Sequence, residues 1–423
     1  MESIATSSTF KNYIAFWMGQ LTSLLGSSVI QFVIVWWLAL ETGSPIVLSV
    51  AAFLGFLPQV IISPLAGVYI DRWNRKLIIG ITDFLQAYIT IYLIILFAFN
   101  ASEVWLVILI NSARGICQAF HFPAVNAIIP IMVPKKRLSR INGINYLFTG
   151  LINTMGPVIG AILNDIWLIS NILWIDVFTF LIAIIPLLLI KIPSVLETKH
   201  MKKETFREDF KLGTYVLKNV PGLLVLLILI SVVNFLSVPF NTLMPLFVKN
   251  NHSGSATDLA MVMALIQIGM ISGALFSAIR KDWKNRVRVI FLGIIIASSG
   301  YIFATLSPPG FFIMIGIGGL FRAAMVPVIN TNFLTIIQTH VSAETQGRVM
   351  SIVIAIAMAV SPIGIILSGP IAESIGIVPL YLIFASLEFV SVIITWTFTN
   401  IRHVNYKEIQ ILETSVDLKE RMN

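Results

Sequence analysis

Gly67-Val-Tyr-Ile-Asp-Arg-Trp-Asn-Arg-Lys76 is a short charged turn between two long apolar runs. Asp71 and Arg75 stand four residues apart, a spacing that brings a carboxylate and a guanidinium to one face of a helical turn. Asp282-Trp-Lys-Asn-Arg286 repeats the pattern Asp-x-x-x-Arg between two further apolar runs, 211 residues after the first copy. In a chain of 423 residues this offset indicates two similar halves.

The composition excludes most soluble proteins. Hydrophobic residues make up 57% of the chain and charged residues only 11%, whereas a soluble domain carries roughly 25% charged residues. A surface this poor in charge indicates that lipid is the solvent. The single cysteine excludes an intrachain disulfide framework. The net charge of +8 could suggest nucleic acid, but the basic residues lie in short loops and at span ends, where membrane topology explains them.

Twelve apolar stretches are long enough to cross a bilayer, which takes about 20 residues each. The first is too long for a signal peptide and has no small-residue cleavage site after it, so we expect it to remain as a span. The spans are expected at 13–40, 46–70, 77–99, 104–128, 142–164, 168–190, 222–248, 257–279, 287–306, 310–337, 348–370 and 377–399.

The distribution of basic residues supports this count. If the N-terminus is cytoplasmic, 25 of the 28 lysines and arginines fall on the inner side. One missed or invented span would destroy this separation. The sequence therefore predicts an all-α, multi-pass protein of the cell membrane, bacterial in origin, with both termini in the cytoplasm.

The longest polar stretch divides the spans six and six. We expect an N-terminal six-helix bundle at 1–190, a cytoplasmic linker at 191–221, a C-terminal six-helix bundle at 222–400 and a cytoplasmic tail at 401–423. Within the linker, 207–218 reads as an amphipathic helix at the inner surface, with Phe206, Phe210, Tyr215 and Leu217 facing lipid or protein; the alternative is a solvated connector. The halves match further at Arg114 and Arg322, which are 208 residues apart. Two six-helix halves generally place a binding site at the midplane between them.

These residues resemble the major facilitator superfamily. Gly67-x-x-x-Asp71-Arg72-x-x-Arg75-Lys76 is similar to that family's loop 2–3 signature, with Asn74 in place of the second glycine. Gly156-Pro157-x-x-Gly160-Ala161 resembles the Gly-Pro-x-x-Gly-Gly element of the antiporter branch. Several strings, among them Ala119-Phe-His-Phe-Pro-Ala-Val-Asn-Ala127 and Ser361-Pro-Ile-Gly-Ile-Ile-Leu-Ser-Gly369, are similar to Mef-type macrolide efflux proteins. The resemblance implies two pseudo-symmetric bundles that alternate access to a central cavity.

The resemblance also implies a conformational latch in the charged turns. Asp71, near the end of its span, can sit against the positive N-terminal end of a neighbouring helix. The expected latch residues are Gly67, Asp71, Arg72, Arg75, Asp282 and Arg286. The alternative is a loop whose charges only set topology. Gly156, Pro157 and Gly160 bend a helix and let a partner approach closely, which serves either an antiport role or tight packing.

Charges inside spans are costly and generally mark function. The candidates for proton carriage, substrate contact or interhelical ion pairing are Asp83, Arg114, His121, Asp176, Arg322 and Glu388. We expect carboxylates or backbone carbonyls as partners of the two arginines. Asp176 ranks first as a proton carrier because of its outer-leaflet position, with a salt bridge to a neighbouring helix as the alternative.

The substrate cavity is expected to be amphipathic and mostly uncharged. Its candidate residues are Gln20, Ser27, Gln31, Phe56, Gln118, Asn234, Asn241, Gln267 and Asn330. Aromatic rings and neutral hydrogen-bonding groups suit a large lipophilic substrate better than a sugar or a phosphate. The alternative for each polar residue is an interhelical hydrogen bond.

The sequence indicates a secondary transporter and not an enzyme. It has no phosphate-binding Gly-x-x-x-x-Gly-Lys-Ser/Thr and no Cys/His cluster with metal spacing, so we expect no metal or cofactor and a proton gradient as the energy source. The expected partners are a lipophilic small molecule, protons and membrane lipids, without nucleic acid; assistance by a separate ATPase subunit stays open. Export of lipophilic drugs such as macrolides by proton antiport is the first hypothesis. Export of a siderophore or lipid-like metabolite is the second, and a transport-inactive sensor or scaffold is the third.

Overall fold

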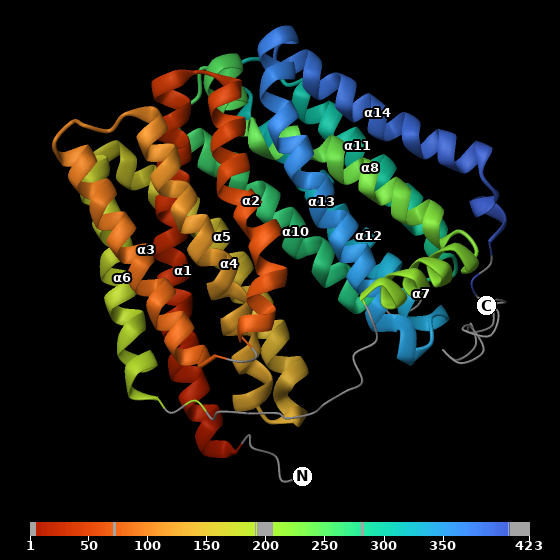
Figure 1. The fold of residues 1–423 in the computed structure, drawn as a ribbon. Helices are drawn as coiled ribbons and strands as arrows, with labels where there is room; N and C mark the ends of the chain where they lie inside the picture. Colours follow the sequence, from red (N-terminus) through yellow and green to blue (C-terminus); the bar gives the residue numbers. More distant parts are fainter. Residues whose placement is uncertain are drawn as a thin grey trace. The chain divides into compact units, whose positions relative to one another are not determined.

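The computed structural model describes residues 6–70, 73–190, 192, 206–280, 283–404 and 406, and these residues form only helices and connecting turns (Figure 1). Twelve of the helices in this part of the chain are long and apolar enough to cross a membrane. The spanning helices are α1 Ser7–Thr42, α2 Pro45–Ile70, α3 Arg75–Ala98, α4 Val104–Met132, α5 Leu138–Ile166, α6 Ile169–Leu189, α8 Leu223–Thr242, α10 Ala256–Ile279, α11 Arg286–Thr305, α12 Phe312–His340, α13 Ala343–Ile375 and α14 Ile377–Phe398.

All twelve predicted spans are confirmed as helices, with one correction. The seventh span was expected to run to residue 248, but α8 ends at Thr242 and is followed by the short helix α9 Met244–Leu246 and a π-helical turn at Phe247–Asn251. Pro245 explains the break, because its ring nitrogen cannot donate a hydrogen bond to the preceding turn. Elsewhere the ends shift by at most six residues: α1 begins six residues early, and α13 extends five residues beyond the prediction at each end.

The helix ends follow from local chemistry. Thr6 and Thr9 form a reciprocal capping box at the start of α1, and Gly43 ends that helix at φ 60°, a left-handed conformation that glycine adopts without strain. Asn74 and Asn285 occupy matching places in the two charged turns. Each accepts backbone hydrogen bonds at the start of the following helix, α3 or α11.

The chain divides into two compact units. The first comprises Met1–Thr198 and Pro245–Ala264, and the second comprises Lys199–Met244 and Leu265–Asn423. This division differs from the expected boundary because the stretch after α8 packs with the first unit. There the Lys249 ammonium donates to the carbonyls of Ala39 and Leu40 at 2.7 and 2.8 Å, in the last turn of α1.

Within the first unit, α1 packs against α5 and α6, and α3 packs against α4 and α6. Within the second unit, α8 packs against α13 and α14, and α11 packs against α12 and α14. Four helix pairs of one unit thus recur in the other, in the same chain order. The duplication that the sequence predicted is a duplication of packing as well.

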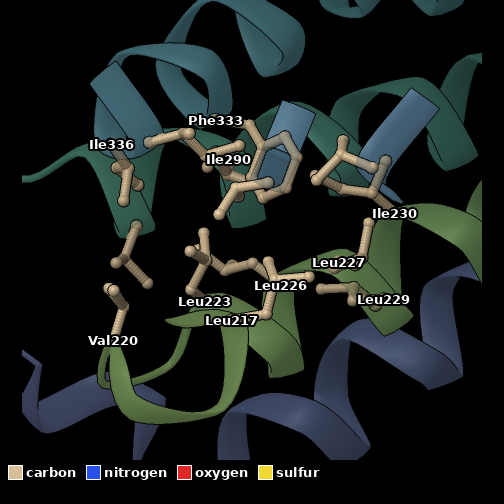
Figure 2. Close-up of a cluster of buried hydrophobic side chains, with 14 of the residues drawn as sticks. Leu217, Val220, Leu223, Leu226, Leu227, Leu229, Ile230, Ile290, Phe333 and Ile336 are labelled. Atoms are coloured by element: carbon tan, nitrogen blue, oxygen red, sulfur yellow. The ribbon is translucent and has the colours of Figure 1, made fainter. Parts of the chain in front are cut away.

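The linker contains the expected helix, α7 Phe206–Asn219. Leu212, Val216 and Leu217 are buried, and α7 packs against α13 of its own unit. Figure 2 shows Leu217 and Val220 beside leucines of α8, with Ile290 of α11 and Phe333 of α12 opposite. The sequence left open whether the apolar face of this helix contacts lipid or protein. Leu212, Val216 and Leu217 are covered by protein. The side chains of Phe206 and Phe210 lie outside the described part of the chain.

Candidate functional site

Four helices of the first unit bring a buried ion pair together. The Arg114 guanidinium on α4 lies 3.0 Å from the Asp176 carboxylate on α6, and both side chains are almost fully buried. Ser27 of α1 donates to one carboxylate oxygen at 2.8 Å, and Thr90 of α3 donates to the other at 2.7 Å. The hydroxyls also contact the guanidinium, at 3.4 Å for Ser27 and 2.6 Å for Thr90. We call these four residues the ion-pair layer of the first unit.

The second unit contains the same arrangement. Arg322 of α12 donates two hydrogen bonds of 3.1 Å to the Glu388 carboxylate of α14. Ser237 of α8 and Ser298 of α11 donate to the same carboxylate at 3.0 and 3.2 Å. The matching residues of the two units are 208 to 212 positions apart. Each half thus places its arginine on the fourth span, its acid on the sixth, and a hydroxyl on each of the first and third.

The two ion-pair layers differ in how the arginine is held. Glutamate is one carbon longer than aspartate, and Glu388 meets the guanidinium through both oxygens, the strongest geometry for such a pair. Arg322 also lies over the rings of Tyr301 and Phe240, at 4.5 and 5.3 Å from their centroids. Asp176 makes a single short contact, and Thr90 bridges the remaining distance.

The first unit has additional buried polar side chains on the same helices. Asp83 of α3 lies 2.9 Å from His121 of α4, measured between Oδ1 and Nε2, and accepts a hydrogen bond of 3.3 Å from Gln20 of α1. Gln118 of α4 donates to Gln86 of α3 at 2.9 Å. We call Gln20, Asp83, Gln86, Gln118 and His121 the histidine layer. These residues lie one to two helical turns from the ion-pair layer along the same helices, nearer the end of the unit where α2 is followed by α3.

These contacts locate all six predicted intramembrane charges. Every one lies in an ion pair with another of the six, and the expected carboxylate partners of Arg114 and Arg322 are confirmed. The reading of Asp176 as a salt-bridge partner matches its surroundings, whereas its first rank as a proton carrier has no support from them.

The predicted cavity residues separate into two groups. Gln20, Ser27 and Gln118 hydrogen-bond to Asp83, Asp176 and Gln86 within the first unit, the interhelical alternative for each of them. The remaining six are exposed or half-buried, and their role in substrate binding stays a prediction: Gln31, Phe56, Asn234, Asn241, Gln267 and Asn330.

The Gly-Pro element is a packing contact. A Cβ atom at Gly156 would overlap the side chain of Ser28 on α1, and one at Gly160 would lie 2.9 Å from the ring of Phe32. Pro157 lies inside α5 and removes one backbone donor there. The glycines therefore allow α5 to approach α1 closely, and an antiport role for the element stays a prediction.

Three of the six predicted latch residues lie in the described part of the chain. Asp71, Arg72 and Asp282 lie outside the described residues, and Gly67 lies in the last turn of α2. Arg75 begins α3, and the Arg286 guanidinium donates to Asn332 at 3.2 Å. Lys76, which belongs to the same signature, donates to the carbonyls of Leu188 and Ile190 at 2.8 and 2.7 Å and so completes the C-terminal end of α6.

Sequence reasoning missed the hydroxyl and amide partners of the buried charges. Thr90, Ser237 and Ser298 surround the acids, and Gln86 extends the histidine layer. A signal was present in the spacing. Asp83, Gln86 and Thr90 follow one another at three and four residues, which places them on one face of α3.

Comparison with known proteins finds similarity to one superfamily of transporters and to efflux proteins. Residues 16–353 match the Major Facilitator Superfamily. The chain is 29% identical over 396 residues to macrolide efflux protein A of Streptococcus pyogenes, covering 93% of this chain and 98% of that protein. It is 24% identical to the multidrug efflux pump Tap of Mycolicibacterium fortuitum, covering 84% and 88%.

A solved structure shares the fold. The chain matches a bacterial homologue of the human lysosomal transporter Spinster, in its inward-facing and occupied conformation, with a TM-score of 0.67. The match has 15% sequence identity and covers 96% of this chain and 100% of that one. The duplicated bundle, the twelve spans and the family match together show that this chain belongs to the Major Facilitator Superfamily and is a multi-pass transporter of the cell membrane, not an enzyme.

Proposed function

We propose that this protein exports lipophilic drugs of the macrolide class by exchange for protons, with both termini in the cytoplasm. Similarity to macrolide efflux protein A over nearly the whole of both chains supports the direction and the class of cargo. A proton gradient is the energy source that fits a chain without a phosphate-binding motif.

The state of the two intramembrane arginines supports a neutral or cationic cargo. An anionic siderophore would require Arg114 and Arg322 as clamps. Both guanidiniums are buried and engaged by carboxylates of their own unit, so recruiting either one would break a buried ion pair. This pairing is the observation that favours drug export over the siderophore alternative.

Expression in a drug-sensitive bacterial host tests the proposal. Cells are challenged with erythromycin, other macrolides and unrelated antibiotics, and the accumulation of labelled erythromycin is measured with and without an uncoupler. We expect macrolide resistance and low accumulation that the uncoupler reverses. Unchanged susceptibility to every drug, together with siderophore appearing in the medium, would favour the second hypothesis instead.

A further inference from the structure

Among the described residues of the second unit, we find no counterpart of the histidine layer. The ion-pair layers match at offsets of 208 to 212 residues, so the same offsets locate the positions equivalent to the histidine layer. At an offset of 208, Asp83, Gln118 and His121 correspond to Phe291, Val326 and Ile329. An offset of 211, which relates the two charged turns, gives Ile294, Ile329 and the polar Asn332 instead. Because Arg114 and Arg322 lie on the same helices as His121 and Ile329 and match at 208, we take Ile329 as the counterpart of His121.

Val326, the counterpart of Gln118, is apolar but 40% exposed, and the other equivalent positions are packed as buried hydrocarbon. Phe291, Ile294 and Ile329 are buried members of one apolar cluster. At the offset of 210 that relates Ser27 to Ser237, Gln20 corresponds to Ile230, a residue of the same cluster that Figure 2 shows at the end of the row of α8 leucines. The fold therefore packs well with apolar side chains at these places. Because buried polar groups cost stability, we infer that a role other than folding accounts for the histidine layer.

The two layers also differ in how firmly their charges are held. Asp176 accepts two hydroxyl hydrogen bonds besides its arginine, and Arg114 stays charged at any physiological pH. Asp83 faces a histidine, whose charge changes in the physiological range. Among the described residues, Nε2 of His121 finds no hydrogen-bond partner of good geometry despite its 2.9 Å approach to the carboxylate. A buried nitrogen without a well-aligned hydrogen bond calls for an explanation.

Few charged or titratable groups surround the Asp83–His121 pair in the described part of the first unit. From α1 the neutral amide of Gln20 faces Asp83, and on α4 the nearest charged or titratable groups are Arg114 and Cys117. Asp176 of α6 is engaged by Arg114. The described part of α2 has no ionisable side chain except Tyr69, which is exposed at the end of that helix. His121 retains 15% exposure and Asp83 only 3%, so the imidazole is the more accessible member of the pair.

We propose that the Asp83–His121 pair binds the proton that the transporter exchanges for its cargo. Asp83 and His121 together hold one proton more in the proton-bound state of the transporter than in the state that has released the proton. The ion-pair layer keeps its charges in both states. This inference rests on the proposed proton-coupled export, and it selects one pair from the six intramembrane charges.

The test separates coupling from transport. The full-length protein is reconstituted into liposomes, and labelled erythromycin is followed in two assays. In the first, an acidic lumen drives uptake; in the second, labelled and unlabelled erythromycin exchange at equal pH on both sides. We expect Asp83→Asn and His121→Gln to lose uptake driven by the pH gradient and to retain exchange. Asp83→Glu, which keeps a carboxylate, retains both.

The matched control is His403→Gln, which removes an exposed histidine outside the spans. It is expected to behave like the unmodified protein in both assays. Uptake driven by the pH gradient in Asp83→Asn and His121→Gln would overturn the proposal. Loss of exchange together with uptake in all three variants of the pair, in monodisperse protein, would assign the pair to cargo binding or structure and would also overturn it. If the unmodified protein shows neither uptake nor exchange of erythromycin, the proposed function itself fails.

Discussion

Arg322 and Glu388 meet through two parallel hydrogen bonds of 3.1 Å between α12 and α14, with the carboxylate fully buried. Arg114 and Asp176 repeat the relationship between α4 and α6. A buried pair of this kind is weak support for stability when it is complete but leaves a costly charge when one member is removed. The pairs therefore tie the fourth span of each half to the sixth.

Removal of one member of the second-unit pair should destabilise the protein more than removal of both. Arg322→Met leaves the Glu388 carboxylate buried with only two serine hydroxyls, at a cost of about 3–5 kcal/mol. The double variant Arg322→Met with Glu388→Leu should recover most of this loss. Thermal unfolding in detergent, followed by size-exclusion chromatography, measures both. Equal melting temperatures for the single and double variants would show that the carboxylate does not need its arginine.

Gly156→Ala should loosen the contact between α5 and α1. The added methyl group overlaps the side chain of Ser28, and overpacking of this kind typically costs about 1–3 kcal/mol. Gly143 lies on the same helix, and a Cβ there meets nothing within 4 Å, so Gly143→Ala is the matched control. We expect a lower melting temperature for Gly156→Ala alone. Identical melting of the two variants would contradict the packing role of the glycine.

Tyr406→Phe should detach the segment that follows α14. The phenol donates to the Pro221 carbonyl at 2.7 Å, and the Tyr406 carbonyl lies 2.6 Å from Nε2 of His340. Loss of the phenol hydrogen bond should cost about 1 kcal/mol, detectable as a lower melting temperature and as earlier cleavage of the tail by added protease. An unchanged cleavage rate would mean that the hydrogen bond does not hold the segment.

The same tyrosine gives a pH dependence with a defined sign. Burial raises the pKa of Tyr406 above its usual value of 10.0, so the phenol loses its proton more readily in the unfolded chain. The contribution of Tyr406 to stability is complete below pH 10 and falls as the pH rises from there towards the raised value. Melting temperatures measured across this range should therefore fall more steeply for the unmodified protein than for Tyr406→Phe.

Asp71→Asn should abolish efflux while the protein stays in the membrane. This prediction rests on the repeated Asp-x-x-x-Arg turns and on the expectation that a helix N-terminus stabilises the Asp71 carboxylate. Asp282→Asn tests the second copy. Immunoblotting of membranes establishes the amount of protein, and erythromycin accumulation establishes efflux. Normal accumulation by Asp71→Asn would leave the turn with a topological role only.

The spans could be predicted because hydropathy and charge are properties of short stretches. Twenty apolar residues read as a span whatever surrounds them, and the basic residues gave an independent count. The break after Thr242 was missed because its cause, Pro245, lies inside an apolar run that hydropathy alone does not divide.

The sequence predicted the charged residues of the candidate site but not the hydroxyl side chains that hydrogen-bond to them. An ionisable side chain in a span is conspicuous, so all the members of the three ion pairs were identified. Serine and threonine within spans are common and mostly bond to their own helix, so residue type alone did not distinguish Ser298 or Thr90 from Thr305. Comparing the two halves position by position would have separated them, because Thr90 and Ser298 recur at the same offset of 208 residues as Arg114 and Arg322.

Each arginine finds its acid inside its own unit, so neither half depends on the other for charge neutrality in the bilayer. Splitting the coding sequence within the 193–205 stretch would therefore yield two polypeptides, each with its own arginine–carboxylate pair in the membrane. Co-expressed as separate chains, they should reassemble into a working exporter, which would make this transporter amenable to dissection by halves.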